Sequence, residues 1–417
     1  MNWKTEVLLK VKPNSAEEQS LKNKVNHFLK KLDSHLKDAH AILGGSGAKN
    51  TWLKGEHDAD IFVLFSEKYR DNGHKLADML EASIKKLHQP YERLHGSRDY
   101  YRIYEEDFLF EIIPILHIKK AIEAKNITDV SPLHAAWVQK HASSKLCDEI
   151  RLTKAFCKAQ KCYGAESYIR GFSGYVLEIL TIHYGSFEKL LKASQKWAEK
   201  EIIDVAKLYK KKADVWTELN GSKLQSPLII IDPVDKTRNA AAALSKERWL
   251  LFKEKASKFL KKQNCLFFER TYMTIPSLKS KKGKHHIVAI EIITVDGKED
   301  KIGAQLLLAF DYLKKHMAEF DLIEADWEWD KHSKALFWFI VKNAGRPKKE
   351  LRKGPPLEMK EYVADFKKKH KKIKIKDGHI WAEIDVKDYT LKAHVMSKLN
   401  DSYVKEKLNK LIDVVII

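Results

Sequence analysis

The sequence predicts an α+β protein made of several domains. Its 417 residues, 44% of them hydrophobic, exceed what one core accommodates and indicate about two to four domains. Helix-like and strand-like hydrophobic periods alternate over residues 1–142, helix-like periods dominate residues 143–254, and residues 255–417 combine strand patterns with many lysines. We therefore expect a mixed-sheet domain, a mostly helical domain and a basic α+β region with these boundaries.

The first predicted domain begins with an amphipathic helix. Ser15–Glu18 has the pattern of a capping box, and apolar residues then recur at helical spacing over residues 21–36. A strand is predicted at Ala39–Leu43, just before a glycine-rich turn. A second amphipathic helix is predicted over residues 76–87, because apolar side chains again recur at helical spacing.

A glycine turn followed by two aspartates organises this domain. Gly44, Gly45 and Ser46 precede a predicted strand that begins with Asp58 and Asp60. Because strand side chains alternate between faces, the two carboxylates share one face, with Cα atoms roughly 6.6 Å apart. Magnesium prefers oxygen ligands, and glycines let backbone N–H groups surround a phosphate. The stretch therefore predicts a magnesium site for nucleotidyl transfer, although Asp-x-Asp alone is more often a solvated strand end.

A second strand is expected to contribute a third carboxylate. Residues 107–116 are apolar apart from Glu111, and Pro114 is expected to stop the strand. A carboxylate in such a strand is costly to bury unless a cation or a hydrogen-bond donor meets it. This cost favours Glu111 as a third metal ligand. The alternative is a glutamate on an edge strand that reaches solvent.

The predicted central domain contains a helix with a basic stripe. Arg151, Lys154, Lys158 and Lys161 recur on one face of residues 148–163, beside an apolar face. Such a stripe is compatible with a solvated surface. Alternatively, if it faces the acidic strand across a cleft, its lysines would act as point charges that hold a triphosphate.

A turn later in the central domain places an arginine shortly after two aspartates. The apolar strand at residues 229–231 is followed by Asp232, Asp235 and Arg238. An arginine held by neighbouring carboxylates keeps a fixed orientation, which suits planar hydrogen bonding to a base edge or a phosphate. By itself, the group is more often a structural ion pair.

The C-terminal region combines strands with basic clusters. Ile287–Thr294 is a predicted strand followed by a turn at Asp296, and Ile373–Lys376 with Ile380–Ile384 is a predicted hairpin. The formal charge of +20 indicates a polyanionic partner, either nucleic acid or an acidic membrane surface. Charge runs are usually solvated faces and aromatic residues usually core, but three basic clusters interleaved with aromatic residues favour a surface that follows a phosphate backbone. The candidate RNA-binding residues are Arg346, Lys348, Lys349, Arg352, Lys353, Lys367, Lys368 and Lys369.

Several classes of protein are disfavoured. No apolar run approaches the roughly 20 residues of a spanning helix, and the N-terminus lacks the pattern of a signal peptide. Cys147, Cys157, Cys162 and Cys265 are too few and too irregular for a disulfide framework or a CxxC metal site. The histidine pair at 285–286 is interpreted as basic surface rather than as a zinc site. We expect a cytoplasmic protein without a membrane partner.

In order and spacing, these motifs resemble those of the archaeal (class I) CCA-adding enzymes, which are tRNA nucleotidyltransferases of the polymerase-β-like superfamily. The resemblance covers most of the chain and rests on GGSGAKNTWLKGEHDADIFVLF, FEIIPIL, TDVSPLH, DEIRLTKAFCKAQKCYGAE, GFSGYVLEIL, IDPVDKTRN and KGPP. The first motif alone is typical of the superfamily, and the central motifs are specific to the family. The resemblance implies a polymerase-β-like palm, a helical nucleotide-binding domain and a C-terminal tRNA-binding body and tail.

The resemblance also implies a reaction and its participants. The enzyme would add C, C and A to the tRNA 3′ end from CTP and ATP, release pyrophosphate and use two Mg²⁺ ions. It would bind the acceptor stem and TΨC arm of tRNA, and a homodimer is left open. The implied catalytic and metal-binding residues are Asp58, Asp60 and Glu111, and the implied nucleotide contacts are Gly45, Ser46, Lys49, His134, Lys154, Tyr163 and Arg238, with Arg238 reading the incoming base.

Two residues depart from the family pattern. The family usually has aspartate at the position of Glu111 and arginine at that of Lys49. Glutamate remains an oxygen ligand, whereas lysine lacks the bidentate fork of arginine. Two alternatives also remain open: another enzyme on the same palm, such as a poly(A) polymerase or an oligoadenylate synthetase, and a non-catalytic RNA-binding protein on a decayed palm. The intact Asp58 and Asp60 argue against the second.

Overall fold

A computed structural model describes residues 2–281, 283–294, 297–345, 349–385, 390–408 and 410–416. The chain forms two compact units, Met1–Arg270 and Thr271–Ile417, here called unit 1 and unit 2. The three-domain division predicted from the sequence is finer than these two units and stays a prediction. Within the described residues, the helices all lack the combination of length and apolarity that crossing a bilayer requires.

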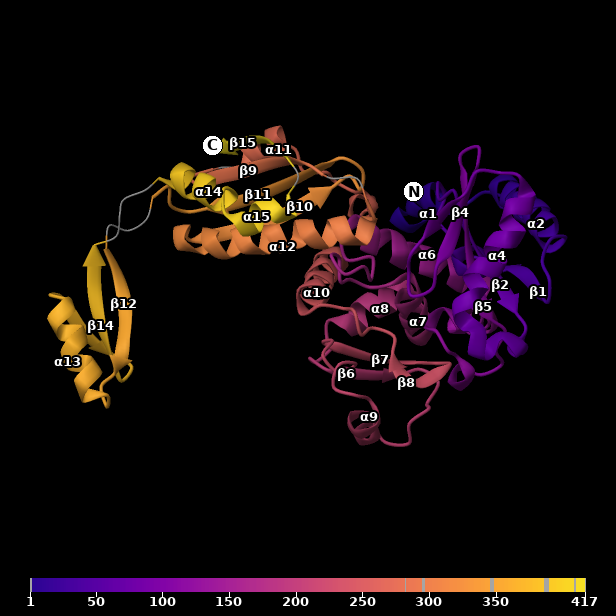
Figure 1. The fold of residues 1–417 in the computed structure, drawn as a ribbon, viewed down its shortest axis with the longest axis horizontal. Coiled ribbons are helices and arrows are strands. Elements are labelled where there is room, and N and C mark those ends of the chain that lie inside the picture. The colour runs from indigo at the N-terminus through magenta and orange to yellow at the C-terminus, as the bar shows by residue number, and fades with distance from the viewer. Residues whose placement is uncertain are drawn as a thin grey trace. The chain divides into compact units, whose positions relative to one another are not determined.

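Unit 1 contains a five-stranded mixed sheet with the strand order β1-β2-β5-β4-β3 (Figure 1). Only β2 and β5 run parallel to each other, whereas the other neighbours are antiparallel. Alternate residues of β2, including Ile61 and Val63, pack into a core with Phe28 of α2 and Leu80 of α4. The strands and helices of this part are β1 (Ala39–Leu43), β2 (Asp58–Phe65), β3 (Glu92–Leu94), β4 (Tyr100–Glu105), β5 (Phe108–Leu116), α2 (Ser15–Asp33), α3 (Gly45–Ala48) and α4 (Leu76–Ile84).

The rest of unit 1 is mostly helical and has its own core. Phe156 of α6, Leu177 of α7, Phe187 of α8 and Phe252 of α10 meet in this core, beside a small sheet with the order β6-β7-β8. The elements are α1 (Trp3–Val11), α5 (Ser131–His141), α6 (Ser144–Ala159), α7 (Gly174–Tyr184), α8 (Phe187–Ser194), β6 (Glu201–Asp204), α9 (Lys212–Glu218), β7 (Leu228–Asp232), β8 (Asp235–Asn239) and α10 (Lys246–Lys261).

The predicted elements of the first domain are confirmed, with two corrections. The capping box of α2 is formed by Asn14 and Glu17, not by Ser15 and Glu18: the Glu17 N–H donates to Asn14 Oδ1 at 2.9 Å, and the Asn14 N–H donates to Glu17 Oε2 at 2.7 Å. Pro114 does not stop its strand, since β5 extends to Leu116. The ladder between β4 and β5 ends at Ile112, so the missing N–H of Pro114 removes no hydrogen bond from it.

The described residues of unit 2 form two sheets. The larger has the order β10-β11-β9-β15 and lies beside α12 (Figure 1). Phe310 of α12 packs against Phe337 and Phe339 of β11. The smaller has the order β12-β14-β13 and includes the predicted hairpin. The elements are α11 (Ile275–Lys281), β9 (His286–Ile293), α12 (Glu299–Met317), β10 (Leu322–Trp329), β11 (Lys334–Val341), β12 (Lys349–Pro356), α13 (Lys360–Lys369), β13 (Ile373–Lys376), β14 (His379–Asp385), α14 (Leu391–Leu399), α15 (Ser402–Lys407) and β15 (Lys410–Ile416). Asp296, placed in a predicted turn, lies outside the described residues.

Candidate active site

Three carboxylates gather on one face of the five-stranded sheet. Ala59, Ile61 and Val63 of β2 point into the core with α2 and α4, so Asp58 and Asp60 project from the opposite face. Asp60 pairs in register with Glu111 of the parallel strand β5. Because residues opposite each other on neighbouring strands point to the same side, the structure brings the three predicted carboxylates together.

The electrostatics of this group favour a bound cation. Removal from water, together with repulsion from the Glu111 and Asp58 carboxylates, raises the pKa of Asp60 from 3.8 to about 6, against an opposing effect of Lys49. Desolvation also raises the pKa of Asp58, with added repulsion from Glu56 and Glu111. Carboxylates that repel one another in this way fit a divalent cation, whose charge would offset the repulsion.

The glycine turn packs directly against Asp60. The Gly44 N–H donates to the Asp60 carbonyl oxygen at 2.7 Å. Gly45 has a φ of +55°, and a Cβ at this position would lie 1.7 Å from Oδ2 of Asp60. Only glycine therefore fits here without displacing the carboxylate. The turn places Ser46 in the short helix α3 and Lys49 at its C-terminal end.

Glu111 has a cationic partner on the neighbouring strand. Nε and Nη2 of Arg102 in β4 lie 2.7 and 2.6 Å from Oε1 of Glu111. Strand β5 lies between β2 and β4, so the alternative of an edge-strand glutamate is wrong. A buried carboxylate needs a cation or a hydrogen-bond donor, and Arg102 meets this need. The burial of Glu111 is therefore no longer evidence for a bound metal. The role of Glu111 as a metal ligand stays a prediction that rests on its position beside Asp60.

Two of the predicted nucleotide contacts share a buried carboxylate. Nζ of Lys49 lies 2.7 Å from Oε2 of Glu178, and Nζ of Lys154 lies 2.8 Å from Oε1. Thr51 donates to the same Oε1 at 2.7 Å. Burial raises the pKa of Glu178, but Lys154 and Lys49 outweigh it and lower the pKa to about 2. Glu178 is therefore ionised and holds both ammonium groups in place.

His134 and Arg238 share a second buried carboxylate. Oδ2 of Asp232 lies 2.9 Å from Nε2 of His134 and 2.5 Å from Nη1 of Arg238. Tyr175 donates to Oδ1 of the same aspartate at 3.1 Å, and its ring stacks on His134 with the centroids 4.1 Å apart. Asp235, the other aspartate of the predicted turn, accepts from the Thr237 N–H instead.

The basic stripe predicted over residues 148–163 is buried at Arg151 and Lys154, whereas the Lys158 side chain is 40% exposed and Lys161 lies beyond the end of α6. Arg151 is 1% exposed and donates to the Trp52 carbonyl oxygen and the Asn50 side chain, while Lys154 is 4% exposed. The reason is that the segment following α3 packs against this face of α6. Tyr163 also lies near Lys154, since a Cβ on Gly174 would lie 2.9 Å from the Tyr163 hydroxyl and 3.7 Å from Cε of Lys154.

The two carboxylate-centred groups are connected through Tyr175. Nζ of Lys49 lies 5.8 Å from the centroid of the Tyr175 ring, which itself stacks on His134. Sequence reasoning missed Glu178, Tyr175 and Arg102. A usable signal existed for Glu178, because a carboxylate stands alone in the apolar helix GYVLEILTIHY and needs a cation when buried.

The described members of the predicted RNA-binding set lie on β12 of the smaller sheet of unit 2 and on α13. Arg352 and Lys353 are exposed on β12, and the backbone of Lys349 begins that strand. Lys353 lies above the Trp381 ring, with Nζ 6.0 Å from the centroid. In the last turn of α13, the exposed lysines are Lys367, Lys368 and Lys369. Arg346 and Lys348 lie outside the described residues.

Two protein-family models match the chain. The model described as a nucleotidyltransferase domain matches residues 23–131, which include all three carboxylates. The model described as the second domain of tRNA nucleotidyltransferase matches residues 148–269, which include Lys154, Glu178 and Arg238. Both matches fall within unit 1.

Curated relatives and solved structures are also similar to the chain. The CCA-adding enzyme of Nanoarchaeum equitans is 34% identical over 89% of this chain and 91% of its own length. That of Methanocaldococcus jannaschii is 32% identical over 90% of this chain and 86% of its own length. A cytoplasmic RNA terminal U-transferase superposes with a TM-score of 0.50 at 13% identity, covering 65% of this chain and 98% of its own. Identity this low shows similarity of fold alone.

Proposed function

Because the chain belongs to the family of archaeal CCA-adding enzymes, we propose that it adds C, C and A to the 3′ end of tRNA in the cytoplasm, with CTP and ATP as substrates. In each addition, the tRNA 3′-hydroxyl oxygen displaces pyrophosphate from the α-phosphorus of the nucleotide. The observation that carries this proposal is the group of Asp58, Asp60 and Glu111 on neighbouring strands, directly beside the glycine turn.

Asp58, Asp60 and Glu111 would hold the divalent cations of the reaction, which we propose to be two Mg²⁺ ions. Their oxygen donors and their mutual repulsion fit such ions. When bound, Mg²⁺ lowers the pKa of the attacking hydroxyl and neutralises charge on the triphosphate and the leaving pyrophosphate. Arg102 would orient the Glu111 carboxylate through its two short contacts.

The nucleotide triphosphate would lie between the glycine turn and the two lysines on Glu178. Backbone N–H groups at Gly45 and the Ser46 hydroxyl are donors suited to phosphate oxygens. Lys49 and Lys154 would add positive charge, already fixed in position by Glu178, and Tyr163 would complete the contact beside Lys154. A positioned charge of this kind loses less entropy on binding than a mobile surface lysine.

His134 and Arg238 would contact the incoming base, and Arg238 supports a testable prediction. Losing a charged hydrogen bond costs about 1.5–3 kcal/mol, or roughly ten- to a hundredfold. Arg238→Ala should therefore lower incorporation of C and A by that factor. In steady-state kinetics, the ratio of kcat/KM for CTP or ATP to kcat/KM for UTP should decrease. Arg238→Lys should also reduce discrimination against UTP, because lysine can keep the ion pair with Asp232 but lacks the planar guanidinium group that hydrogen-bonds a base edge.

Lys236 provides the matched control for this measurement. It lies two residues earlier on β8 and pairs with Glu218, with Nζ and Oε2 2.8 Å apart. Lys236→Ala should leave discrimination between nucleotides intact. If Arg238→Ala and Arg238→Lys both discriminate like the unmodified chain, Arg238 is only a structural ion pair.

The function itself is tested by nucleotide incorporation. The full chain is incubated with tRNA lacking its CCA end, magnesium and each radiolabelled nucleotide, singly and in pairs. CTP alone should extend the tRNA by two residues, and CTP with ATP by three. Long tails from ATP alone would indicate a poly(A) polymerase, and the absence of any incorporation would overturn the assignment.

We propose that the basic residues of unit 2 bind the acceptor stem and TΨC arm. Exposed lysines near an aromatic ring suit a phosphate backbone, and removing one lysine–phosphate interaction should reduce the salt dependence of binding by about one unit of slope. Reversing the charges of Lys367, Lys368 and Lys369 to glutamate should raise the KM for tRNA by about tenfold or more, with the KM for CTP and ATP nearly unchanged.

A matched control for this variant exists in unit 1. Lys30 and Lys31 lie in the last turn of α2, as the three lysines do in α13. Reversing their charges should leave the KM for tRNA close to its original value.

A minihelix of acceptor stem and TΨC arm should be extended about as well as whole tRNA. Loss of nucleotide affinity with intact tRNA binding in the α13 variant would contradict this placement.

A further inference from the structure

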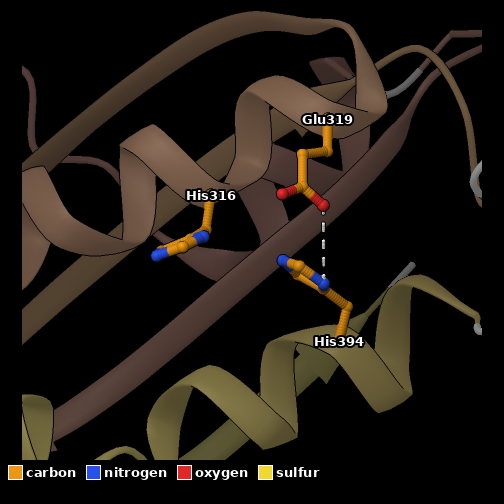
Figure 2. A group of neighbouring side chains, drawn as sticks. All are labelled: His316, Glu319 and His394. Carbon is orange, nitrogen blue, oxygen red and sulfur yellow. Dashed lines mark ion pairs between the residues drawn. The ribbon is translucent and has the colours of Figure 1, made fainter. Parts of the chain in front are cut away.

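Two histidines and a glutamate meet in unit 2, on elements that carry none of the residues proposed for catalysis or RNA binding. His316 lies in the last turn of α12, Glu319 lies in the 3₁₀ turn that follows it, and His394 lies on α14 (Figure 2). Figure 2 shows the three side chains pointing toward one another from these two parts of the chain. One potential ligand atom of each residue lies within 4.8 Å of those of the other two.

The spacing of these atoms fits a shared metal better than a direct hydrogen bond. Nδ1 of His394 and Oε2 of Glu319 are 3.9 Å apart, which is longer than a hydrogen bond. Bonds of about 2.0–2.2 Å from nitrogen or oxygen to a tetrahedral zinc ion would place neighbouring ligand atoms roughly 3.4 Å apart. These two atoms would therefore need to approach by about 0.5 Å, and a pair at the 4.8 Å limit of the cluster would need to approach by about 1.4 Å.

The surroundings allow this approach from one side. The His394 side chain is 2% exposed and the Phe320 ring packs edge-on against it, with the centroids 5.0 Å apart. The Glu319 side chain is 32% exposed and has three side-chain torsions. The His394 imidazole is therefore held in place, and the Glu319 carboxylate can rotate toward a bound metal ion.

We propose that His316, Glu319 and His394 bind one zinc ion, with water as the fourth ligand. Two imidazoles and one carboxylate are a donor set that suits zinc, whereas magnesium prefers oxygen ligands alone. This site goes beyond the proposed function, since it uses none of the residues assigned to the reaction. The site would be structural, and the zinc ion would link α14 to the end of α12.

Helix α14 begins where the chain returns from the smaller sheet, so a metal ion on α14 would act close to this junction. The chain returns from the smaller sheet at Thr390, which pairs with Gly345, and the Leu391 N–H donates to the Ala344 carbonyl oxygen at 2.8 Å. His394 follows one helical turn after this crossing. The zinc ion would therefore anchor the point at which the segment carrying β12, β13, β14 and α13 joins the rest of unit 2.

Zinc binding to the full chain tests the proposal. The protein, without a polyhistidine tag, is stripped with a chelator and equilibrated with Zn²⁺ in excess Mg²⁺. The expected result is one equivalent of zinc that is lost in His316→Gln, Glu319→Gln and His394→Gln. Removing an outer-shell partner alone weakens metal affinity by about 10–100-fold, so removing a ligand should weaken it more. His316 and Glu319 are partly exposed, so their variants should fold even if His394→Gln does not.

Matched controls lie elsewhere in unit 2. His332→Gln and Glu358→Gln change exposed residues of the same types and should keep the zinc equivalent. Zinc should raise the midpoint of thermal unfolding for the unmodified chain and for the controls, but not for the His316 and Glu319 variants. If no zinc binds, or if the His316 and Glu319 variants retain the same equivalent with the same thermal shift, the proposal is overturned.

Discussion

Replacing Asp60 with alanine is expected to reduce nucleotide addition by at least about a thousandfold while the affinity for tRNA stays nearly unchanged. Asp60 lies between Asp58 on its own strand and Glu111 on the next, and its carboxylate packs against Gly45. The proposed tRNA contacts are in unit 2, far along the chain from this site. Single-turnover kinetics should report the first effect, and filter binding of labelled tRNA should report the second.

The folding of this variant can be separated from its activity. Desolvation and the neighbouring carboxylates raise the pKa of Asp60 to about 6, so on balance its charge opposes folding at neutral pH, and its removal costs only the smaller attraction to Lys49. Asp60→Asn keeps the shape of the side chain and should be as inactive as Asp60→Ala. Asp107→Ala removes an exposed carboxylate just before β5 and should remain active. Full activity in Asp60→Asn would refute the site assignment.

Replacing Glu178 with glutamine should destabilise the folded chain by about 3–5 kcal/mol, because it leaves buried cations without their partner. Glu178 is fully buried, and the side chains of Lys154 and Lys49 are only 5% and 11% exposed. Glutamine fits the same space, so the loss reflects charge rather than a cavity. Urea unfolding of the full chain, followed by circular dichroism, would measure the change in free energy of unfolding.

A second substitution distinguishes the charge effect from a packing effect. Glu178→Gln combined with Lys154→Met removes one of the two stranded cations, the more deeply buried one, and should recover part of the lost stability. Glu254→Gln breaks an exposed pair on α10, where Lys258 Nζ lies 2.5 Å from the Glu254 carboxylate, and should change the free energy of unfolding by less than about 1 kcal/mol. A loss of that small size in Glu178→Gln would show that Glu178 does not hold the two lysines.

The acidic site could be predicted because its geometry is mostly local. The two-residue period of a strand places Asp58 and Asp60 on one face whatever surrounds them. The pairing of β2 with β5 then brings Glu111 beside Asp60. The role of Arg102 could not be predicted in the same way, because it depends on which strand lies on the other side of β5.

The partners of the basic residues could not be predicted, because they come from distant parts of the sequence. Thr51 and Glu178 are 127 residues apart along the chain, and His134 and Asp232 are 98 residues apart. Helical periodicity correctly separated an apolar and a basic face on α6. It could not reveal that the segment after α3 buries Arg151 and Lys154 on the basic face.

The histidine cluster of unit 2 shows the same limit. His316 and Glu319 stand three residues apart, a local signal that the sequence offers. His394 joins them only because α14 packs against the end of α12. The histidine pair that the sequence made conspicuous, at residues 285–286, is not part of this cluster.

Sequencing the 3′ ends of reacted tRNA tests the central claim most directly. The chain is given tRNA that lacks its CCA end, magnesium and all four nucleoside triphosphates at equal concentrations. We expect most molecules to end in cytidine, cytidine and adenosine, with no further extension, and we expect no extension by Asp60→Ala. Homopolymeric tails, or the same CCA ends made by Asp60→Ala, would contradict the assignment of CCA addition to the carboxylates of β2 and β5.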